Sequence, residues 1–264
     1  MTAPPRILIV AGSDSGGGAG LQADLKTVLA LGGYGMTAVT ALTAQNTLGV
    51  HEVLPVPASF VRRQMRVVLD DLGADAVKTG MLKDAGIIAA VAEELPDGVP
   101  LVVDPVMVAK GGAALLDPDA IDALKRLLLP RTTVLTPNLP EAEALLGLTI
   151  GDLDGMKRAA GILLGLGPAA VLLKGGHLPG DMVHDVLADR SGIRIFSAPR
   201  IPSHHTHGTG CTLASALATG LGAGRPLAEA VARAREYVRE AIRAAPGFGR
   251  GHGPLGHGHT VGKF

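Results

Sequence analysis

Six short, unbroken apolar runs constrain the fold of this chain more than any other feature. They are rich in β-branched residues and do not alternate with polar ones, at residues 6–12, 35–42, 75–80, 100–106, 132–138 and 169–176. Strands of this kind are buried on both faces, which is typical of parallel sheets covered by helices. The sequence therefore predicts an α/β fold with a mostly parallel central sheet.

Helix-period segments separate these runs, and most of them start near Asp, Ser or Pro and end at Gly or Pro, as helix capping requires. They cover residues 20–32, 59–73, 84–96, 117–130 and 152–167, followed later by 210–224 and 226–245. Residues 183–199 place a Gly-centred turn between two β-like runs and predict an antiparallel hairpin. We expect one doubly wound domain over residues 1–264, with an irregular tail at 247–264.

The amino-acid composition limits the kinds of partner that the protein could bind. Lys plus Arg equals Asp plus Glu at 24 each, aromatic residues make up 2%, and Trp is absent. These values favour neither nucleic acid nor an anionic membrane surface as a partner. No uncharged apolar run approaches the roughly 20 residues that span a bilayer. The single Cys excludes an intramolecular disulfide, and the N-terminal residues lack a signal-peptide pattern, so we expect a cytoplasmic protein.

Polar residues or glycines end strand after strand: Gly12-Ser13-Asp14, Lys78-Thr79-Gly80, Asp104-Pro105, Thr136-Pro137-Asn138 and Lys174-Gly175-Gly176. Loops are often polar, so one such ending means little. Several together predict a ligand site beyond the carboxyl ends of the strands. The first of these turns, in AGSDSGGGAGLQADL, matches neither standard nucleotide-binding loop. It still favours close approach to a small ligand, with Asp24 and Gln45 either as hydrogen-bonding partners or as ordinary helix and surface-turn residues.

The segment HGTGCTLASAL places Gly208, Thr209, Gly210 and Cys211 at the expected start of a helix. Free backbone N–H groups and the helix dipole there favour an anion. The same field lowers a thiol pKa, which predicts that Cys211 is partly thiolate and serves as a base or nucleophile. The alternative is a small buried apolar residue.

Three further side chains fit such a site. Asn138 and Glu141, three residues apart, are either a helix cap or a Mg²⁺ site near a phosphate. Lys174 lies at the end of a buried strand, where its charge requires an anion or an acidic side chain as a partner. We interpret the partner as a phosphate. The histidines at 204, 205, 207, 252, 257 and 259 have no metal-ligand spacing, so we interpret them as ordinary hydrogen-bonded or solvated residues.

Taken together, these motifs resemble the hydroxymethylpyrimidine/phosphomethylpyrimidine kinases of the ribokinase-like superfamily. The resemblance covers nearly the whole chain and rests on AGSDSGGGAGLQADLKT, TALTAQNTLGV, GML, VVDPVMVAKGG, LTPNLPEAEALLG, LLKGGH, THGTGCTLASALA and GRGHGPLGH, in that order. It implies a three-layer α/β/α sandwich, a homodimer, and an ATP- and Mg²⁺-dependent enzyme. The implied reaction phosphorylates 4-amino-5-hydroxymethyl-2-methylpyrimidine to its monophosphate and then to the pyrophosphate, for thiamine biosynthesis.

The resemblance also implies roles for individual residues. The pyrimidine would contact Gln45, Asp24, Gly12, Met81 and Val108. Lys174, Asn138 and Thr209 would bind ATP, and Glu141 and Asp104 would serve Mg²⁺. The expected catalytic set is Cys211 with the Gly208, Thr209 and Gly210 amides, Lys174 and Asp104.

Three alternatives remain open on the sequence. A pyridoxal or pyridoxine kinase would share the scaffold and chemistry, although Ala109, where we associate a cysteine with pyridoxal activity, favours the pyrimidine. A non-catalytic pyrimidine-binding relative would have no need of Lys174, Glu141 and the GTGC turn. A cysteine hydrolase would require Cys211 and His207 in contact.

Overall fold

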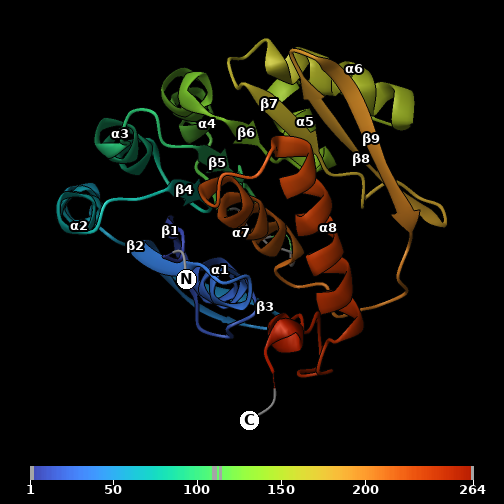
Figure 1. The fold of residues 1–264 in the computed structure, drawn as a ribbon, viewed down its shortest axis with the longest axis horizontal. Coiled ribbons are helices and arrows are strands. Elements are labelled where there is room, and N and C mark those ends of the chain that lie inside the picture. The colour runs from blue at the N-terminus through green and yellow to red at the C-terminus, as the bar shows by residue number, and fades with distance from the viewer. Residues whose placement is uncertain (1–2, 109–111, 113–114, 263–264) are drawn as a thin grey trace.

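A mixed sheet runs through the centre of the molecule (Figure 1). The computed structural model describes residues 3–108, 112 and 115–262. Within that part of the chain the sheet has nine strands in the order β3-β2-β1-β4-β5-β6-β7-β8-β9. All pairings from β2 through β7 are parallel, while β3, β8 and β9 are antiparallel to their neighbours. This confirms the predicted mostly parallel sheet.

Each of the six predicted runs contains a strand, in the predicted order, although the lengths differ. They are β1 (Arg6–Asp14), β2 (Tyr34–Asn46), β4 (Ala76–Thr79), β5 (Leu101–Val103), β6 (Val134–Leu135) and β7 (Ala170–Leu173). The hairpin is present as β8 (Met182–Asp189) and β9 (Gly192–Pro199). The central strands β4 to β7 are buried at every residue, which is why their sequences do not alternate.

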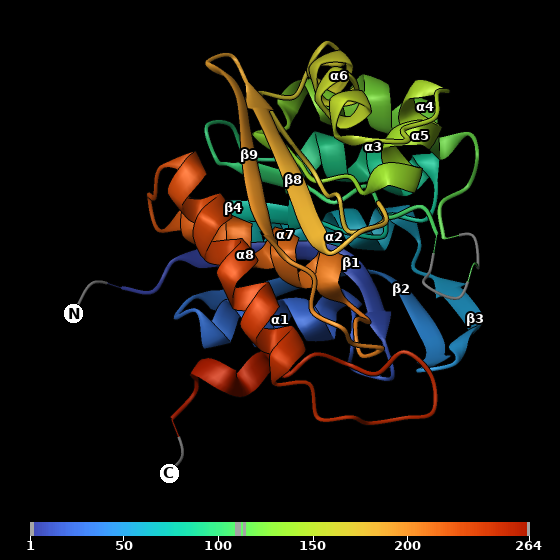
Figure 2. The ribbon, with the colours of Figure 1, turned by 90° about the vertical axis from the view of Figure 1, so that its right-hand side faces the viewer.

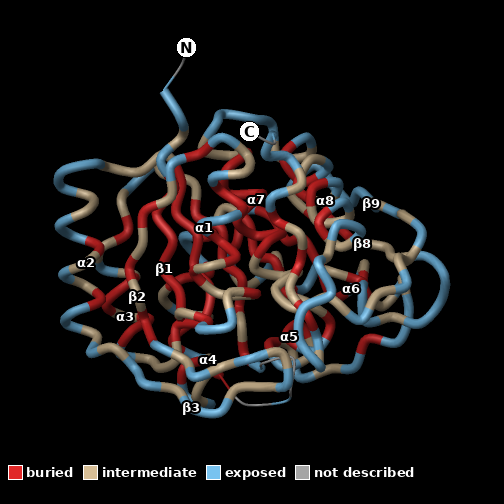
Figure 3. The backbone as a smooth tube through the Cα atoms, turned by 90° about the horizontal axis from the view of Figure 1, so that it is seen from below, coloured by how far each residue is buried: buried red, intermediate tan, exposed pale blue. Residues whose placement is uncertain are grey.

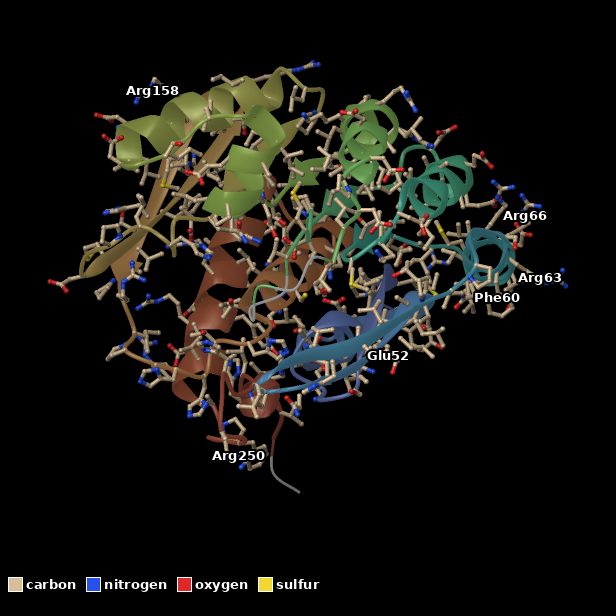
Figure 4. The ribbon with its side chains drawn as sticks, turned by 180° about the vertical axis from the view of Figure 1, so that it is seen from behind. Glu52, Phe60, Arg63, Arg66, Arg158 and Arg250 are labelled. Atoms are coloured by element: carbon tan, nitrogen blue, oxygen red, sulfur yellow. The ribbon has the colours of Figure 1, made fainter. Side chains whose placement is uncertain are left out.

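Helices cover both faces of the sheet, which gives three layers (Figure 2). One face packs on α1 (Gly20–Ala30), α7 (Thr209–Gly222) and α8 (Leu227–Arg243). The other packs on α2 (Ala58–Asp71), α3 (Ala85–Glu94), α4 (Ala120–Ala123), α5 (Leu139–Leu146) and α6 (Leu153–Leu164). The two apolar cores lie on either side of the sheet, where Figure 3 shows the buried backbone. Charged side chains such as Arg63 and Arg66 project outward from α2 (Figure 4).

Two elements differ from the sequence prediction. Strand β3 (Gly49–Pro55) was not predicted, because its side chains are mostly exposed or half-buried at the edge of the sheet and lack an apolar run. The helix predicted over 117–130 is only one turn of α-helix, α4. It continues as a π-helical turn at Leu124–Leu128 and a 3₁₀ turn at Leu129–Arg131, where Pro130 ends the regular pattern.

The segment after α8 is irregular apart from a 3₁₀ turn, η3 (His257–Thr260), but it is firmly docked. Figure 2 shows it leaving α8, running beneath β1 toward β2 and β3, and returning to η3. Its backbone bonds to Thr47, to His207 and to Ala241 along the way. No helix in the described part of the chain has the length and hydropathy to cross a membrane.

Candidate active site

A cavity of about 550 Å³ lies at the carboxyl ends of the parallel strands. Its walls include almost every residue that the sequence singled out: Gly12, Gln45, Met81, Asp104, Val108, Asn138, Glu141, Lys174, Gly208, Thr209, Gly210 and Cys211. The structure thus brings these residues together around one cavity at this edge of the sheet. Ala109 lies outside the described residues.

Asp24 is the exception, because it does not line the cavity. Its carboxylate is fully buried on the inner side of α1, 2.7 Å from Nζ of Lys78, and it accepts a hydrogen bond from Ser215 Oγ at 2.7 Å. Burial alone would lower the pKa of Lys78, but the adjacent Asp24 carboxylate raises it; burial raises the pKa of Asp24 against the effect of Lys78. The expected direct contact between Asp24 and a ligand is thus corrected to a buried ion pair beneath the cavity wall.

The GTGC turn adopts the conformation that its glycines permit. Gly208 caps α7 with φ of 83°, a left-handed conformation that favours glycine. A Cβ atom there would lie 1.9 Å from the carbonyl oxygen of Gly18, so the turn packs directly on the Gly-rich turn after β1. The first N–H groups of α7 have no acceptors within the helix, and their residues line the cavity. The Thr209 amide donates to the carbonyl of Thr206 at 3.4 Å, a long hydrogen bond. This arrangement suits an anion.

Cys211 contradicts part of the prediction. Burial raises the pKa of its thiol to about 11. The Lys78 ammonium and the Gly20 amide act in the opposite direction, whereas Asp24 and Asp104 add to the rise. At neutral pH Cys211 is therefore a thiol at the cavity wall, and the expected standing thiolate is wrong.

Lys174 lies between two carboxylates beside the GTGC turn, since a Cβ atom at Gly210 would lie 3.1 Å from its Nζ. Its Nζ is 2.8 Å from Oδ1 of Asp104 and 4.0 Å from Oε2 of Glu141. Burial alone would lower the pKa of Lys174, but the two carboxylates raise it, so it stays cationic. Burial raises the pKa of Glu141 to about 7, with Lys174 opposing and Asp104 reinforcing the shift. A negatively charged ligand group could take the place of these carboxylates as the partner of Lys174, because a lysine cation forms charge-assisted hydrogen bonds with either.

Asn138 and Glu141 form a capping box at the start of α5. The Asn138 side chain accepts from the Glu141 amide at 2.9 Å, and the Glu141 carboxylate accepts from the Asn138 amide at 2.8 Å. Capping chemistry is thus present, and both residues also line the cavity. The two interpretations of this motif are compatible.

Asp14 and His207 are cavity residues that the sequence reasoning did not assign. His207 Nε2 lies 2.9 Å from Asp14 Oδ2 and 2.9 Å from the Gln45 side-chain amide. The signal available in the sequence was their position, since Asp14 ends β1 and His207 precedes the GTG turn. No hydrogen bond joins His207 to Cys211 among the described residues, so the structure gives a cysteine hydrolase no support.

Comparisons with known proteins show the family of the chain. Residues 14–256 match the family model described as phosphomethylpyrimidine kinase. The chain is 52% identical to a hydroxymethylpyrimidine/phosphomethylpyrimidine kinase from Streptomyces coelicolor, covering 98% of this chain and 97% of that one. It is 55% identical to a thiamine biosynthesis bifunctional protein from Geobacter sulfurreducens, covering 95% of this chain but only 52% of that longer protein.

Solved structures give the same fold. The pyridoxal kinase from Staphylococcus aureus in complex with AMP-PCP and pyridoxal superposes with a TM-score of 0.90 at 37% identity, covering 97% of this chain and 94% of that one. The three-layer α/β/α sandwich is the ribokinase-like fold of such kinases. On the family match and the near-full-length relatives, the chain belongs to the phosphomethylpyrimidine kinase family.

Proposed function

We propose that this protein transfers phosphoryl groups from ATP to 4-amino-5-hydroxymethyl-2-methylpyrimidine, giving the monophosphate, and then to the monophosphate, giving the pyrophosphate for thiamine biosynthesis. One observation carries the proposal. A single cavity joins an anion-accepting helix start and a buried lysine to a wall of apolar and amide side chains. The curated relatives of the family, named for this activity, support the choice of substrate.

One end of the cavity would bind phosphate groups and the other end the pyrimidine. The Gly208, Thr209, Gly210 and Cys211 amides and Lys174 would bind the transferred phosphoryl group, with Asn138 and Thr209 serving ATP. Gln45, Gly12, Met81 and Val108 would hold the pyrimidine. Phosphoryl transfer depends mostly on positioning and electrostatic stabilisation, which fixed amides and a permanently charged lysine supply.

Cys211 would lie against the acceptor hydroxymethyl group. A neutral thiol cannot take up the alcohol proton, so Cys211 would have to lose its own proton first, and only its small thiolate fraction would act as the base. The Lys78 ammonium, which lowers the pKa of the thiol, favours that fraction. Asp24 acts behind this wall by keeping Lys78 charged near Cys211.

The residues present fit Mg²⁺ held largely by phosphates and water. Mg²⁺ is commonly bound through one or two carboxylates plus substrate phosphates. Asp104 and Glu141 are two such carboxylates at the cavity wall, and the described residues contain no cluster of three or more ligating side chains. Bound there, the metal would neutralise charge on the ATP phosphates. Lys174 would keep the two carboxylates in place and contribute its own positive charge.

Pyridoxal or pyridoxine phosphorylation is the second candidate. The observation that favours it is the close superposition on a pyridoxal kinase bound to pyridoxal.

We also propose that the chain works as a homodimer in the cytoplasm. An apolar pair supports the dimer, since Leu42 and Leu54 lie opposite each other on β2 and β3 and are 48% and 61% exposed.

The test is ADP release measured side by side with hydroxymethylpyrimidine, its monophosphate and pyridoxal. We expect the highest kcat/KM with the two pyrimidines. Preference for pyridoxal would replace the first candidate by the second.

Cys211→Ala is expected to bind AMP-PCP as the wild type does but to lose about 100-fold in kcat, the lower range of general acid–base effects. Near-normal turnover would remove the proposed role in proton transfer.

A further inference from the structure

Three side chains from distant parts of the chain share hydrogen bonds at one wall of the cavity. Asp14 ends β1, Gln45 lies near the end of β2, and His207 precedes α7. Oδ2 of Asp14 and the side-chain nitrogen Nε2 of Gln45 both lie 2.9 Å from the same ring nitrogen, Nε2 of His207. The position of one hydrogen atom therefore governs both contacts.

Asp14 fixes that hydrogen atom. Its carboxylate accepts from the backbone amides of Gly16 at 2.8 Å, Gly18 at 3.0 Å and Ala19 at 2.8 Å. Burial alone would raise the pKa of Asp14, but the His207 hydrogen bond and these amides hold it below its ordinary value. An ionised carboxylate only accepts hydrogen bonds, so Nε2 of His207 must carry the hydrogen and donate it.

The hydrogen on Nε2 of His207 determines how the side-chain amide of Gln45 must be oriented. A ring nitrogen that carries a hydrogen does not accept one, so the Gln45 Nε2 that faces His207 in the structure cannot donate to it. The oxygen and nitrogen of a glutamine amide are assigned by hydrogen-bond logic, which here requires the reversed orientation, with Oε1 facing His207. In that orientation the NH₂ group is at the other end of this cavity-lining side chain.

The ring of His207 packs against backbone on one side, and its main chain is bonded to the C-terminal segment. A Cβ atom at Gly18 would lie 2.5 Å from Cδ2 of His207, so the ring packs directly against that glycine. The His207 backbone amide donates to the carbonyl of Gly253 at 3.1 Å, which ties the residue to the C-terminal segment. His207 is 15% exposed and Asp14 4%. Few other ring orientations fit.

We propose that His207 is a positioning residue that fixes Gln45 as a hydrogen-bond donor to the ligand. The cavity would thereby select a ring that presents an acceptor, such as an aromatic nitrogen lone pair, at that point. This rests on the proposed function, since the pyrimidine substrate has ring nitrogens of this kind. Asp14 acts one step further away, through His207.

The first test needs no substrate. Long-range ¹H–¹⁵N NMR of the imidazole rings distinguishes a hydrogen on Nε2 from one on Nδ1, and the ring signals missing from His207→Gln identify His207. We expect Nε2 to be protonated in the ligand-free wild type. A neutral ring protonated on Nδ1 alone would overturn the proposal.

The second test separates positioning from a merely structural role. His207→Gln keeps an N–H donor near the place of Nε2, whereas His207→Leu does not. For His207→Leu we expect the KM for the pyrimidine to rise about tenfold, the scale of one hydrogen bond, with the KM for ATP unchanged. His207→Gln should restore the KM to within about threefold, and both variants should keep the circular dichroism spectrum of the wild type.

A double-mutant cycle with Gln45→Ala completes the test. If His207 acts through Gln45, His207→Leu should have less than about a twofold effect on the pyrimidine KM in the Gln45→Ala background. An undiminished effect there, or an unchanged KM in the single variant, contradicts the proposal. Absence of turnover by the wild type would refute the proposed function instead, and the NMR result would still decide the position of the hydrogen.

Discussion

Two effects oppose each other at Cys211. The start of α7 favours negative charge on the thiol, and this effect alone predicts a lowered pKa. The sulfur is also buried close to two carboxylates, and burial has the larger effect, raising the pKa to about 11. Sequence motifs identify the helix start but contain no measure of how deeply it is buried. The motif therefore located the residue correctly and gave the wrong ionisation state.

Cys211 is the only cysteine, so its alkylation reports on it alone. Because only the thiolate reacts, the rate with iodoacetamide should be slow at pH 7 and should rise about tenfold per pH unit up to about pH 10. The measurement is mass spectrometry of the intact protein over time. A rate that levels off near pH 8 would show that the helix start outweighs burial.

Glu141 should make stability depend on pH. Its folded-state pKa is about 7 against an ordinary value of 4.5, so the folded state keeps a proton that the unfolded state releases between these values. The stabilisation is complete below about pH 4.5 and is lost as the pH rises through 7. Glu141→Gln keeps the capping box but cannot titrate.

We therefore expect the free energy of unfolding of the wild type, relative to Glu141→Gln, to fall between pH 5 and pH 8. Urea unfolding at four pH values measures it, and Glu229→Gln on the exposed first turn of α8 is the matched control. A difference between wild type and Glu141→Gln that stays constant with pH would be incompatible with the buried carboxyl described here.

Single residues also show where sequence reasoning stops. Lys174 and Asp104 were correctly placed at strand ends, because the ends of parallel strands meet at one edge. Asp24 was misplaced, since its partner Lys78 lies 54 positions away and no local pattern pairs them. His207 was missed for a similar reason, as its partner Asp14 is 193 positions away.

At the scale of elements, the C-terminal segment shows the same limit. Its Gly- and His-rich sequence correctly predicts irregular structure, yet the segment is anchored by contacts that only the fold creates. Tyr237 donates to the carbonyl of His257 at 2.6 Å, and Thr212 at the start of α7 lies 2.9 Å from the His257 ring. The segment thus supports the GTGC turn from below.

Two glycines in this segment test that support. A Cβ atom at Gly256 would lie 2.1 Å from the carbonyl oxygen of Ala244, whereas one at Gly258 would have open space. Gly256→Ala should therefore cost about 1–3 kcal/mol, the usual range for overpacking, and lower the Tm, while Gly258→Ala should not. Differential scanning calorimetry makes the comparison. Equal Tm values for the two variants would mean that the segment is not tightly docked.

At the scale of the whole molecule, we propose one domain, because a single sheet connects β3 to β9 and both apolar cores pack on it. The sheet's interior was predictable from continuous apolar runs. Its edge strand β3 was not, because an exposed edge leaves no comparable pattern in the sequence. That edge also carries the exposed pair Leu42 and Leu54, which the proposed homodimer would bury.

Light scattering after size exclusion tests the dimer. We expect the wild type to have the mass of two 26.8 kDa chains. Leu54→Glu should convert it to a monomer, because a charge would be buried in an apolar contact. Leu29→Glu, at an equally apolar and 74% exposed position on α1, is the control and should stay dimeric. A monomeric wild type, or a dimeric Leu54→Glu, would exclude this interface.

If the protein works as proposed, one cavity brings a γ-phosphoryl group and a pyrimidine alcohol together. ³¹P NMR of the wild type with ATP, Mg²⁺ and 4-amino-5-hydroxymethyl-2-methylpyrimidine is the decisive experiment. We expect a new phosphomonoester signal that grows as ADP forms, followed by the two coupled signals of the pyrophosphate. ADP and inorganic phosphate without any phosphorylated pyrimidine, or unchanged ATP, would contradict it.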